Sequence, residues 1–339
     1  MCTQSPPPTN LGSEDDNDLA NHPTLYFDDG SVILQCSSTL FCVHRGLLQK
    51  HSSVFSEIFK DEDRDGDMFR GKMLIALEDD EEKDIALLLE NIYDGFRVHY
   101  RLLTDDNFDS LARLLRICTK YCVDRPREAI LQRLRLSWPA SLESYDTRPW
   151  DAYSCLSPIV DIRRITVHPA KVISLLRSCS YESQDLLAPL FYAVTTCVSE
   201  SVAESAFILS APDLGRLICG MNKIRCIMMQ VAAGSTFPFD ADEIHECENQ
   251  NRVLSIYRHI LERTVSLYAA EPIEGWAVMI SAFKDLEREE VCRACYSGLV
   301  DFMETTRRDM WDSLADIFDL QSEECLSCRR SERSLSREL

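Results

Sequence analysis

Two cysteines with the spacing of a metal-binding pair lie in the last quarter of the sequence. Cys292 and Cys295 are three residues apart in a segment with helical spacing, so both thiols would lie on one helix face. His245 and Cys247 supply two further ligand types, and three thiolates with one imidazole make a tetrahedral zinc site. We therefore hypothesise zinc bound by these four residues, although their spacing matches no standard zinc motif. The alternative is two packed thiols and a surface histidine.

The other cysteines favour packing over chemistry. Cys325 and Cys328 form another closely spaced pair, but on one straight helix they would lie about 45 Å from the first pair. The sequence has fifteen cysteines, and no secretory signal opens it, so we expect a reducing compartment without disulfides. Most cysteines, such as Cys118 and Cys122, lie in apolar stretches and are expected to be buried as small hydrophobic side chains.

An acidic loop imitates the first half of a calcium-binding loop. Asp61, Asp63 and Asp65 occupy ligand positions 1, 3 and 5, and Gly66 stands at the sharp turn. Position 12 should be a bidentate glutamate, but it is Lys72, a cation that opposes calcium. A strand and not an exit helix is predicted to follow. We therefore interpret this segment as a solvated acidic loop.

Signatures of catalysis are absent from the sequence. It contains no phosphate-binding glycine loop, no nucleophile elbow and no His-Glu-x-x-His motif. His44 falls at a strand-to-helix junction with no nucleophile motif beside it, which favours a packed structural role. Glu81 and Glu82 are explained as charges at a helix start. No catalytic or cofactor-binding residue is predicted. An unrecognised enzyme would need a concave pocket with convergent titratable groups.

Composition and charge exclude several classes of protein. Of 339 residues, 45% are hydrophobic and 27% charged, which is typical of a soluble globular chain and excludes one that is wholly disordered. The net charge of −20 argues against nucleic-acid binding, because phosphate backbones repel an acidic protein. No apolar run approaches the ~20 residues of a membrane span. We expect an intracellular protein, cytoplasmic or nuclear, with no membrane partner.

The chain divides into four segments by composition. Residues 1–23 are acidic and proline-bearing and predict a disordered tail. Residues 24–136 have a mixed strand and helix pattern. Residues 137–320 have helical spacing interrupted by prolines, which predicts an all-α domain. Residues 321–339 are polar and predict a second flexible tail.

Short strands and helices are predicted in the second segment. Val32–Cys36 and Thr39–Val43 are apolar runs separated by a possible turn, which favours a hairpin. The clearest helix carries apolar residues at positions 85, 88, 89, 92 and 93, with Asp79 or Asp80 as its cap and Gly95 at its end. Further predicted elements are a strand at 73–77 and helices at 44–50, 53–59, 104–118 and 126–136.

The third segment predicts helices alone. Apolar spacing indicates helices at 170–177, 186–197 and 213–230. Residues 287–318 carry apolar side chains near one side and could form one long helix. Prolines, among them Pro189, are interpreted as breaks between helices.

Several spaced motifs of the second segment agree in order with one family. This part of the chain resembles a BTB/POZ domain, an α+β fold of short strands with surrounding helices. The matching stretches are Asp28-Asp29-Gly30-Ser31-Val32-Ile33-Leu34, Phe41-Cys42-Val43-His44-Arg45-Gly46-Leu47-Leu48, Ser52-Ser53-Val54-Phe55-Ser56-Glu57-Ile58-Phe59, Ile92-Tyr93-Asp94-Gly95 and Lys120-Tyr121-Cys122-Val123.

The resemblance implies protein–protein interaction, with self-association or cullin binding in some members. Dimeric members usually carry an amphipathic helix and a strand before the core, but residues 1–23 have no helical apolar stripe. Cullin-binding members usually carry a hydrophobic-x-Glu motif in the loop before the third strand. Here that loop, residues 60–72, reads Met68-Phe69-Arg70-Gly71 and lacks the motif.

The helical segment resembles the region that follows BTB domains in a fungal, basidiomycete-like class of proteins. The stretches that carry this resemblance are Leu209-Ser210-Ala211-Pro212-Asp213-Leu214 and Arg307-Arg308-Asp309-Met310-Trp311-Asp312-Ser313-Leu314. We therefore expect a non-enzymatic interaction scaffold or adaptor. The alternatives are a substrate adaptor of a cullin-type ubiquitin ligase and an unrecognised enzyme in the helical half.

Overall fold

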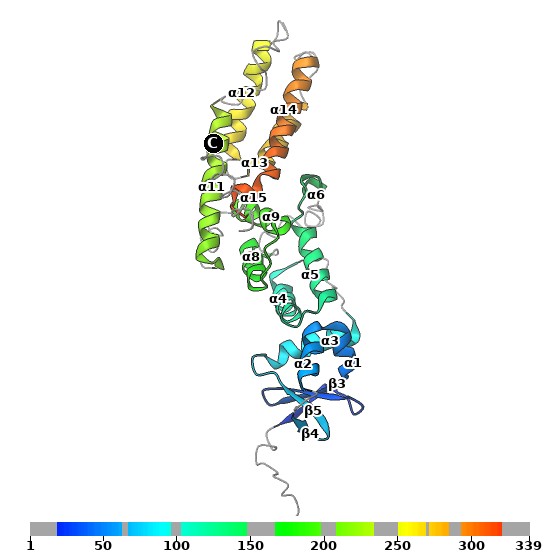
Figure 1. Ribbon diagram of the computed structural model, residues 1–339. Helices are drawn as coiled ribbons and strands as arrows, with labels where there is room; N and C mark the ends of the chain where they lie inside the picture. Colours follow the sequence, from blue (N-terminus) through cyan, green and yellow to red (C-terminus); the bar gives the residue numbers. More distant parts are fainter. Residues whose placement is uncertain are drawn as a thin grey trace, which may run out of the picture. The chain divides into compact units, whose positions relative to one another are not determined.

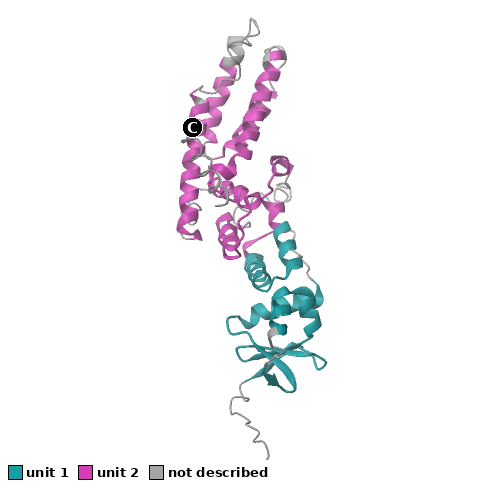
Figure 2. Cartoon of the chain, viewed as in Figure 1, with its two compact units in different colours: residues 1–101, 106–132 teal, residues 102–105, 133–339 magenta. Residues whose placement is uncertain are grey.

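The chain folds into two compact units. A computed structural model describes residues 19–62, 67–95, 103–147, 167–197, 208–233, 250–268, 271–284 and 293–320. The first unit comprises residues 1–101 and 106–132, and the second comprises residues 102–105 and 133–339 (Figure 2). The described part of the first unit holds a sheet with helices, whereas that of the second is helical (Figure 1).

The sheet of the first unit contains five strands among the described residues. In spatial order these are β1 (Ala20–Tyr26), β3 (Thr39–Val43), β2 (Val32–Cys36), β5 (Lys72–Ala76) and β4 (Met68–Phe69). The predicted hairpin is confirmed: β2 and β3 are antiparallel, and Ser37 adopts a φ of 54° at the turn between them. Strand β5 runs parallel to β2, and β1 runs parallel to β3.

Helices cover one face of this sheet (Figure 1). They are α1 (Arg45–His51), α2 (Ser53–Glu62) and α3 (Glu82–Asp94), and they are followed by α4 (Asp105–Lys120) and α5 (Asp124–Ser137). Val32, Phe41 and Phe55 are fully buried, and Ile92 is 8% exposed. The aromatic ring of Phe55 stacks on that of Tyr121 with centroids 4.6 Å apart. These apolar contacts form the core beneath the helices.

Two local predictions for the first unit are wrong. Strand β1 begins at Ala20, so the predicted tail of residues 1–23 includes the start of an edge strand, where Pro23 is tolerated. The N-cap position of α3 is Glu81, and neither Asp79 nor Asp80 occupies it. Gly95 does end α3 with a φ of 78°, as predicted.

The second unit is built from helices, and its described elements extend from α6 to α15. They are α6 (Leu142–Thr147), α8 (Pro169–Ser178), α9 (Gln184–Thr195), α11 (Ala211–Ala232), α12 (Gln250–Leu267), α13 (Pro272–Lys284), α14 (Arg293–Asp312) and α15 (Leu314–Ile317). One core cluster joins α11, α12, α13 and α14 around the buried Trp276. None of the described helices is long and apolar enough to span a membrane.

Two breaks in the helical unit differ from prediction. Pro189 lies inside α9 and not between helices. The predicted single helix at 287–318 is interrupted at Ser313, between α14 and α15, and its residues 287–292 lie outside the described part. The Ser313 hydroxyl donates to the Met310 carbonyl oxygen at 3.0 Å, and such local bonds compete with helix continuation.

Candidate interaction surface

The β4–β5 hairpin presents an exposed apolar side chain at one edge of the sheet. Its turn residues Arg70 and Gly71 both have positive φ, 47° and 74°, which is the geometry of a tight two-residue hairpin turn. Met68, on β4, is 67% exposed. Among the described residues of the first unit, Met68 is the large hydrophobic side chain that is exposed. An exposed methionine on a fixed turn is a suitable anchor for a protein partner.

Side-chain contacts hold this hairpin in place. The Arg70 guanidinium donates to Asn21 Oδ1 at 3.0 Å and to the Tyr26 hydroxyl at 3.3 Å, both on β1. The central carbon of this guanidinium, Arg70 Cζ, also lies 4.8 Å from the centroid of the Phe69 ring. The hairpin and the first strand are therefore tied together, and Met68 projects from a constrained backbone.

The sheet face opposite the helices is closed by the chain's own side chains. The Lys72 ammonium donates to the Asp28 carbonyl oxygen at 2.9 Å and contacts Cys42 Sγ at 3.1 Å. A small apolar cluster lies on this face, consisting of buried Ile33, Leu40 and Cys42 with partly buried Leu19, Tyr26, Phe69 and Leu74. Because this face is already packed, a partner finds the edges of the sheet more accessible than its surface.

Strand β1 forms the other edge of the sheet. Its register with β3 shifts between Asn21 and Tyr26. Within this interval His22 Nδ1 accepts hydrogen bonds from the backbone N–H groups of Thr24 at 3.4 Å and Leu25 at 3.1 Å. The imidazole also stacks on Phe41 with centroids 4.8 Å apart. A side chain that occupies main-chain donors protects an edge against unspecific strand pairing.

His44 has the packed role that its sequence position indicates. The Tyr93 hydroxyl accepts a hydrogen bond from the His44 backbone N–H at 2.9 Å and lies 2.8 Å from His44 Nδ1. His44 Nε2 lies 3.4 Å from Asp29 Oδ2. Burial and the nearby Asp29 carboxylate raise the pKa of Tyr93. The group therefore joins α1 to α3 and offers a protonated tyrosine, not a nucleophile.

Asp80 connects the start of α3 to the end of α4. Its side chain is only 5% exposed and accepts from the Lys120 ammonium at 2.7 Å and the Tyr121 hydroxyl at 2.5 Å. Its backbone carbonyl oxygen accepts from Cys36 Sγ at 3.0 Å. Burial and the Asp80 carboxylate raise the pKa of Tyr121 far above its usual value. These distant partners explain why Asp80 does not cap α3.

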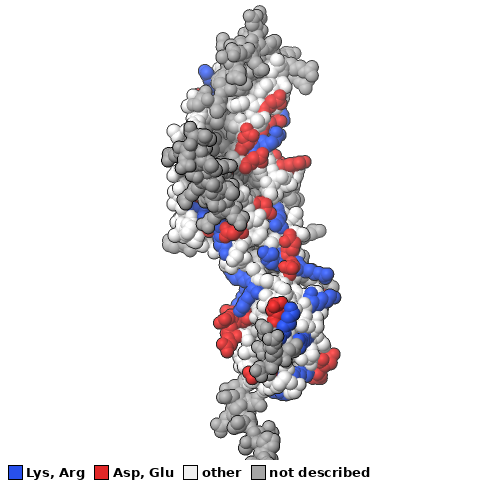
Figure 3. All heavy atoms as spheres, in the orientation of Figure 1, with Lys and Arg blue, Asp and Glu red and all other residues white. Residues whose placement is uncertain are grey.

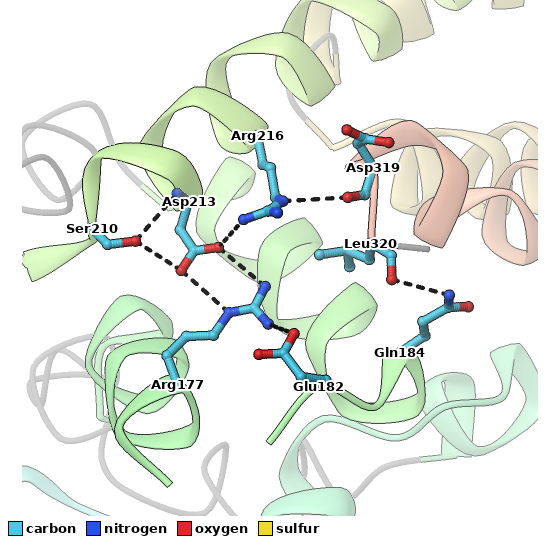
Figure 4. A network of polar contacts seen from close by, with 8 residues as sticks. All are labelled: Arg177, Glu182, Gln184, Ser210, Asp213, Arg216, Asp319 and Leu320. Atoms are coloured by element: carbon cyan, nitrogen blue, oxygen red, sulfur yellow. Dashed lines mark hydrogen bonds and ion pairs between the residues drawn. The ribbon is translucent and has the colours of Figure 1, made fainter. Parts of the chain in front are cut away.

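A second buried carboxylate organises the helical unit (Figure 4). Asp213 is 4% exposed and accepts from Arg177 Nη2 at 3.1 Å, Arg177 Nε at 3.3 Å and Arg216 Nη1 at 3.0 Å. Ser210, the N-cap of α11, accepts from the Asp213 backbone N–H at 3.3 Å. Glu182 forms a further ion pair with Arg177. The network joins α8, the start of α9 and the first turn of α11.

The same network secures the last described residues (Figure 4). Arg216 Nε donates to the Asp319 carbonyl oxygen at 3.3 Å, and Gln184 Nε2 donates to that of Leu320 at 3.0 Å. Lys223 caps two carbonyl groups of α15, each at 3.0 Å. Cations at a helix C-terminus are favourable for the helix dipole. These bonds fix α15 against α9 and α11.

Two tyrosines share one carboxylate in a third polar cluster. Glu274 on α13 accepts from the Tyr192 hydroxyl at 2.5 Å and from the Tyr145 hydroxyl. Arg307 donates to Asp146 Oδ2 at 2.7 Å and so ties α14 to α6. Burial and Glu274 raise the pKa of Tyr192 well above its usual value. Both tyrosines thus act as hydrogen-bond donors that position helices.

The hypothesised zinc ligands fall mainly outside the described residues. His245, Cys247 and Cys292 lie there, and Cys295 is in the first turn of α14 with its side chain outside the described part. Within the described ranges, no group of three or more His, Cys, Asp or Glu side chains could hold a metal ion. The zinc site stays a prediction, which metal analysis of the purified protein tests.

The acidic loop is placed only in part. Residues 63–66 lie outside the described residues, and so do the side chains of Asp61 and Glu62 at the end of α2. Lys72, which occupies the position of the missing glutamate ligand, belongs to strand β5 and bonds elsewhere on the sheet. The prediction that a strand follows the loop is confirmed.

The expected burial of cysteines holds for only some of them. Among the described thiols, Cys36, Cys42, Cys118 and Cys179 are buried. Cys122 is exposed, which contradicts the prediction, because it occupies a turn with a φ of 49° between α4 and α5. Cys219 and Cys226 on α11 are also exposed. Apolar neighbours in the sequence therefore do not indicate that a cysteine is buried.

Comparison with known proteins assigns the first unit. Residues 26–135 match the BTB/POZ domain family. No curated protein matches the chain. The match begins at the last residue of β1 and covers strands β2 to β5 and helices α1 to α4, together with most of α5. The helical unit is therefore interpreted from its own contacts.

Proposed function

Because residues 26–135 form a BTB/POZ domain, we propose that the chain is a non-enzymatic scaffold or adaptor that binds other proteins. The first compact unit, here called the BTB unit, is the docking module. The second, the helical unit, is a scaffold or a second binding surface. The supporting observation is Met68, an exposed apolar side chain on a hairpin that polar contacts immobilise. Binding energy at protein interfaces concentrates in a few such well-positioned side chains.

The engagement of the buried carboxylates supports a non-enzymatic role. Asp80, Asp213 and Glu274 each accept hydrogen bonds from cations or tyrosine hydroxyls that fix secondary structure. A catalytic carboxylate needs a substrate-facing oxygen within hydrogen-bond reach of the reacting group. These three groups are occupied by structural partners instead.

Electrostatics influence which partners associate. The net charge is −20. On the face shown in Figure 3, acidic and basic side chains are interspersed, with uncharged areas between them. The overall charge accelerates encounter with basic partners, while close contact depends on local complementarity. We therefore propose a protein partner with a basic surface.

Affinity capture with matched variants tests this proposal. The full-length chain, the Met68→Asp variant and the Leu136→Asp variant serve as baits, since both side chains are 67% exposed. Met68 lies on β4, whereas Leu136 lies near the end of α5. A partner of the BTB unit is lost with Met68→Asp and kept with Leu136→Asp. Equal recovery by all three baits contradicts docking at the hairpin.

The identity of the captured partner separates scaffold from ligase adaptor. A cullin recovered in stoichiometric amount would replace the scaffold proposal with the adaptor role. Recovery of other proteins without a cullin supports the scaffold. Light scattering of the same three proteins shows whether a second copy of the chain is among the partners of the Met68 surface.

A further inference from the structure

The side chains of Cys42 and Lys72 meet although their strands are not neighbours. Cys42 belongs to β3 and Lys72 to β5, and β2 lies between these strands. Lys72 Nζ nevertheless lies 3.1 Å from Cys42 Sγ. Val32, at the start of β2, pairs with Val43 on one side and with Met73 on the other. These two partners are the chain neighbours of Cys42 and Lys72, so the lysine side chain crosses the end of β2 to reach the thiol.

Contacts on several sides keep the thiol and the amine in place. A Cβ atom on Gly30 would lie 2.7 Å from Cys42 Sγ, so the glycine backbone borders the sulfur closely. The Lys72 ammonium also donates to the Asp28 carbonyl oxygen at 2.9 Å. Cys42 is fully buried, whereas Asp28 is exposed and Lys72 is partly exposed. The ammonium therefore lies between the buried sulfur and solvent, on the side from which a small oxidant approaches.

Other thiols of the same unit contact different groups. Cys36 Sγ donates to the Asp80 carbonyl oxygen at 3.0 Å, and Cys122 Sγ donates to that of Thr119 at 3.8 Å. Once a thiol is oxidised to sulfenic acid, it condenses with a nearby nitrogen but not with a carbonyl oxygen. Cys36 is as fully buried as Cys42, so burial does not distinguish these two thiols. The neighbouring amine is what distinguishes Cys42.

We propose that hydrogen peroxide joins Cys42 to Lys72 by a covalent S–N bond, which makes this pair a redox-modification site. In the first step the sulfur is oxidised to sulfenic acid: it gains a hydroxyl group from peroxide, and water leaves with the thiol proton. In the second step the Lys72 ammonium loses a proton to solvent, and the nitrogen lone pair attacks the sulfur. The S–O bond breaks, and the departing hydroxide takes a proton from the nitrogen and leaves as water.

Thiols reverse this link, and its formation stiffens the hairpin. Attack of a thiolate on the sulfur releases the Lys72 amine and forms a mixed disulfide, which a second thiol reduces to the free Cys42 thiol. In the linked form β3 is tied covalently to β5 and therefore to the β4–β5 hairpin that carries Met68. An effect of the link on partner binding rests on the proposed docking through Met68, whereas the link itself does not.

Peptide mapping after treatment of the full chain with hydrogen peroxide tests the proposal. Free thiols are blocked with N-ethylmaleimide, and the chain is cleaved with trypsin, which cuts after Arg45 and Arg70 and so separates Cys42 from Lys72. The expected product is a joined pair of peptides, lighter than their sum by two hydrogen atoms, which dithiothreitol separates. A joined pair that keeps one oxygen atom, formed with a second peroxide, supports the same site. Absence of any link between Cys42 and Lys72 overturns the proposal.

Three variants and one denaturing condition control the assignment. Lys72→Arg keeps a cation beside Asp28, but its guanidinium stays protonated and does not attack sulfur, so the link should be lost. Cys42→Ser should lose it as well. Cys36→Ser, which removes an equally buried thiol of the same tryptic peptide, should keep it. In urea the two strands separate, and the wild-type chain should lose the link. A link that survives Lys72→Arg or urea arises from random encounter and contradicts the proposal.

The Met68→Asp variant separates the modification site from the proposed docking. Met68 is exposed on β4, and its side chain takes no part in the contact between Cys42 and Lys72. This variant should therefore form the link as the wild-type chain does, even where it captures no partner. Failure of docking through Met68 thus leaves the modification site standing, whereas loss of the link from the wild-type chain leaves the docking proposal standing.

Discussion

The two units bury a carboxylate to nearly the same extent but pair it differently. Asp80 in the BTB unit is 5% exposed, and its cation, Lys120, is 45% exposed. Asp213 in the helical unit is 4% exposed, and one of its cations, Arg177, is only 19% exposed. The Lys120 ammonium can return to water if its partner is lost, whereas the Arg177 guanidinium would remain largely buried with only the exposed Glu182 as a partner. Although the two carboxylates are buried to a similar extent, the helical unit therefore depends more on the Asp213–Arg177 ion pair than the BTB unit depends on the Asp80–Lys120 ion pair.

The difference extends to how each unit is held together. In the BTB unit, strand pairing and an apolar core define the fold, and ion pairs add to it at the rim. In the helical unit, helices share an apolar core around Trp276 and are joined in addition by buried side-chain networks around Asp213 and Glu274. We expect single polar substitutions to affect the helical unit more strongly.

The largest effect is expected for Asp213→Ala. Removing this carboxylate leaves Arg177 without its buried partner and should lower the free energy of unfolding by about 3–5 kcal/mol. All four tryptophans lie beyond residue 137, so urea denaturation followed by tryptophan fluorescence reports on the helical unit. Glu182→Gln, which removes a 72% exposed partner of Arg177, serves as the control. A loss no larger than that of the control would contradict this account of Asp213.

Alanine at the two α11 glycines should act in opposite directions. Gly220→Ala forces a methyl group against the Phe318 ring and should lower the free energy of unfolding by about 1–3 kcal/mol. Gly215→Ala meets open space and should raise it by about 0.5–1 kcal/mol. Both changes are measured by tryptophan fluorescence in urea. If Gly215→Ala instead lowered the free energy of unfolding, an internal contact would require this glycine.

A smaller loss is expected for Asp80→Ala. Lys120 returns to water, and the main cost is the unpaired Tyr121 hydroxyl, about 1–2 kcal/mol. Hydrogen exchange of peptides from α3 and α4 measures this loss within the BTB unit. Asp79→Ala, at an exposed neighbouring position, is the matched control. If Asp80→Ala costs as much as Asp213→Ala, the comparison between the two carboxylates fails.

The smallest predicted effect is a change in how stability depends on pH, and it involves His51. Burial, together with the Lys50 and Arg125 cations, lowers the pKa of His51 below its unfolded value of 6.5. The imidazole therefore contributes stability that is present above the unfolded pKa and is lost as the pH falls through the folded pKa. His51→Gln should flatten the pH dependence by a few tenths of a kcal/mol, about the size expected for an accessible group. Hydrogen exchange of α1 at neutral and mildly acidic pH measures this change in stability with pH. If the His51→Gln variant shows the same pH dependence as the wild type, His51 is not its source.

Strong local patterns predicted the fold of the first unit well. The apolar run of Val32–Cys36, the helical spacing of α3 and Gly95 at its end were each interpreted correctly. Strand β1 was missed because an edge strand with Pro23 and exposed polar residues has no alternating apolar pattern. Asp80 was misassigned as a cap because its partners, Lys120 and Tyr121, are distant in sequence.

The candidate surfaces were less predictable than the fold. A two-residue strand such as β4 is too short to show a period, so the sequence gives no sign that Met68 is exposed. Helix α11 carries apolar residues on both faces, so its spacing indicates a helix but not which side is buried. Exposure at these positions depends on packing against other elements, which local pattern does not encode.

Cross-linking mass spectrometry of the chain with its captured partner tests the proposed docking most directly. Amine-reactive cross-links should join the partner to lysines of the BTB unit, above all Lys72, which lies in the hairpin on β5. They should disappear with Met68→Asp and persist with Leu136→Asp. Cross-links confined to Lys171, Lys223 and Lys284 of the helical unit would contradict the proposal that the BTB unit is the docking module.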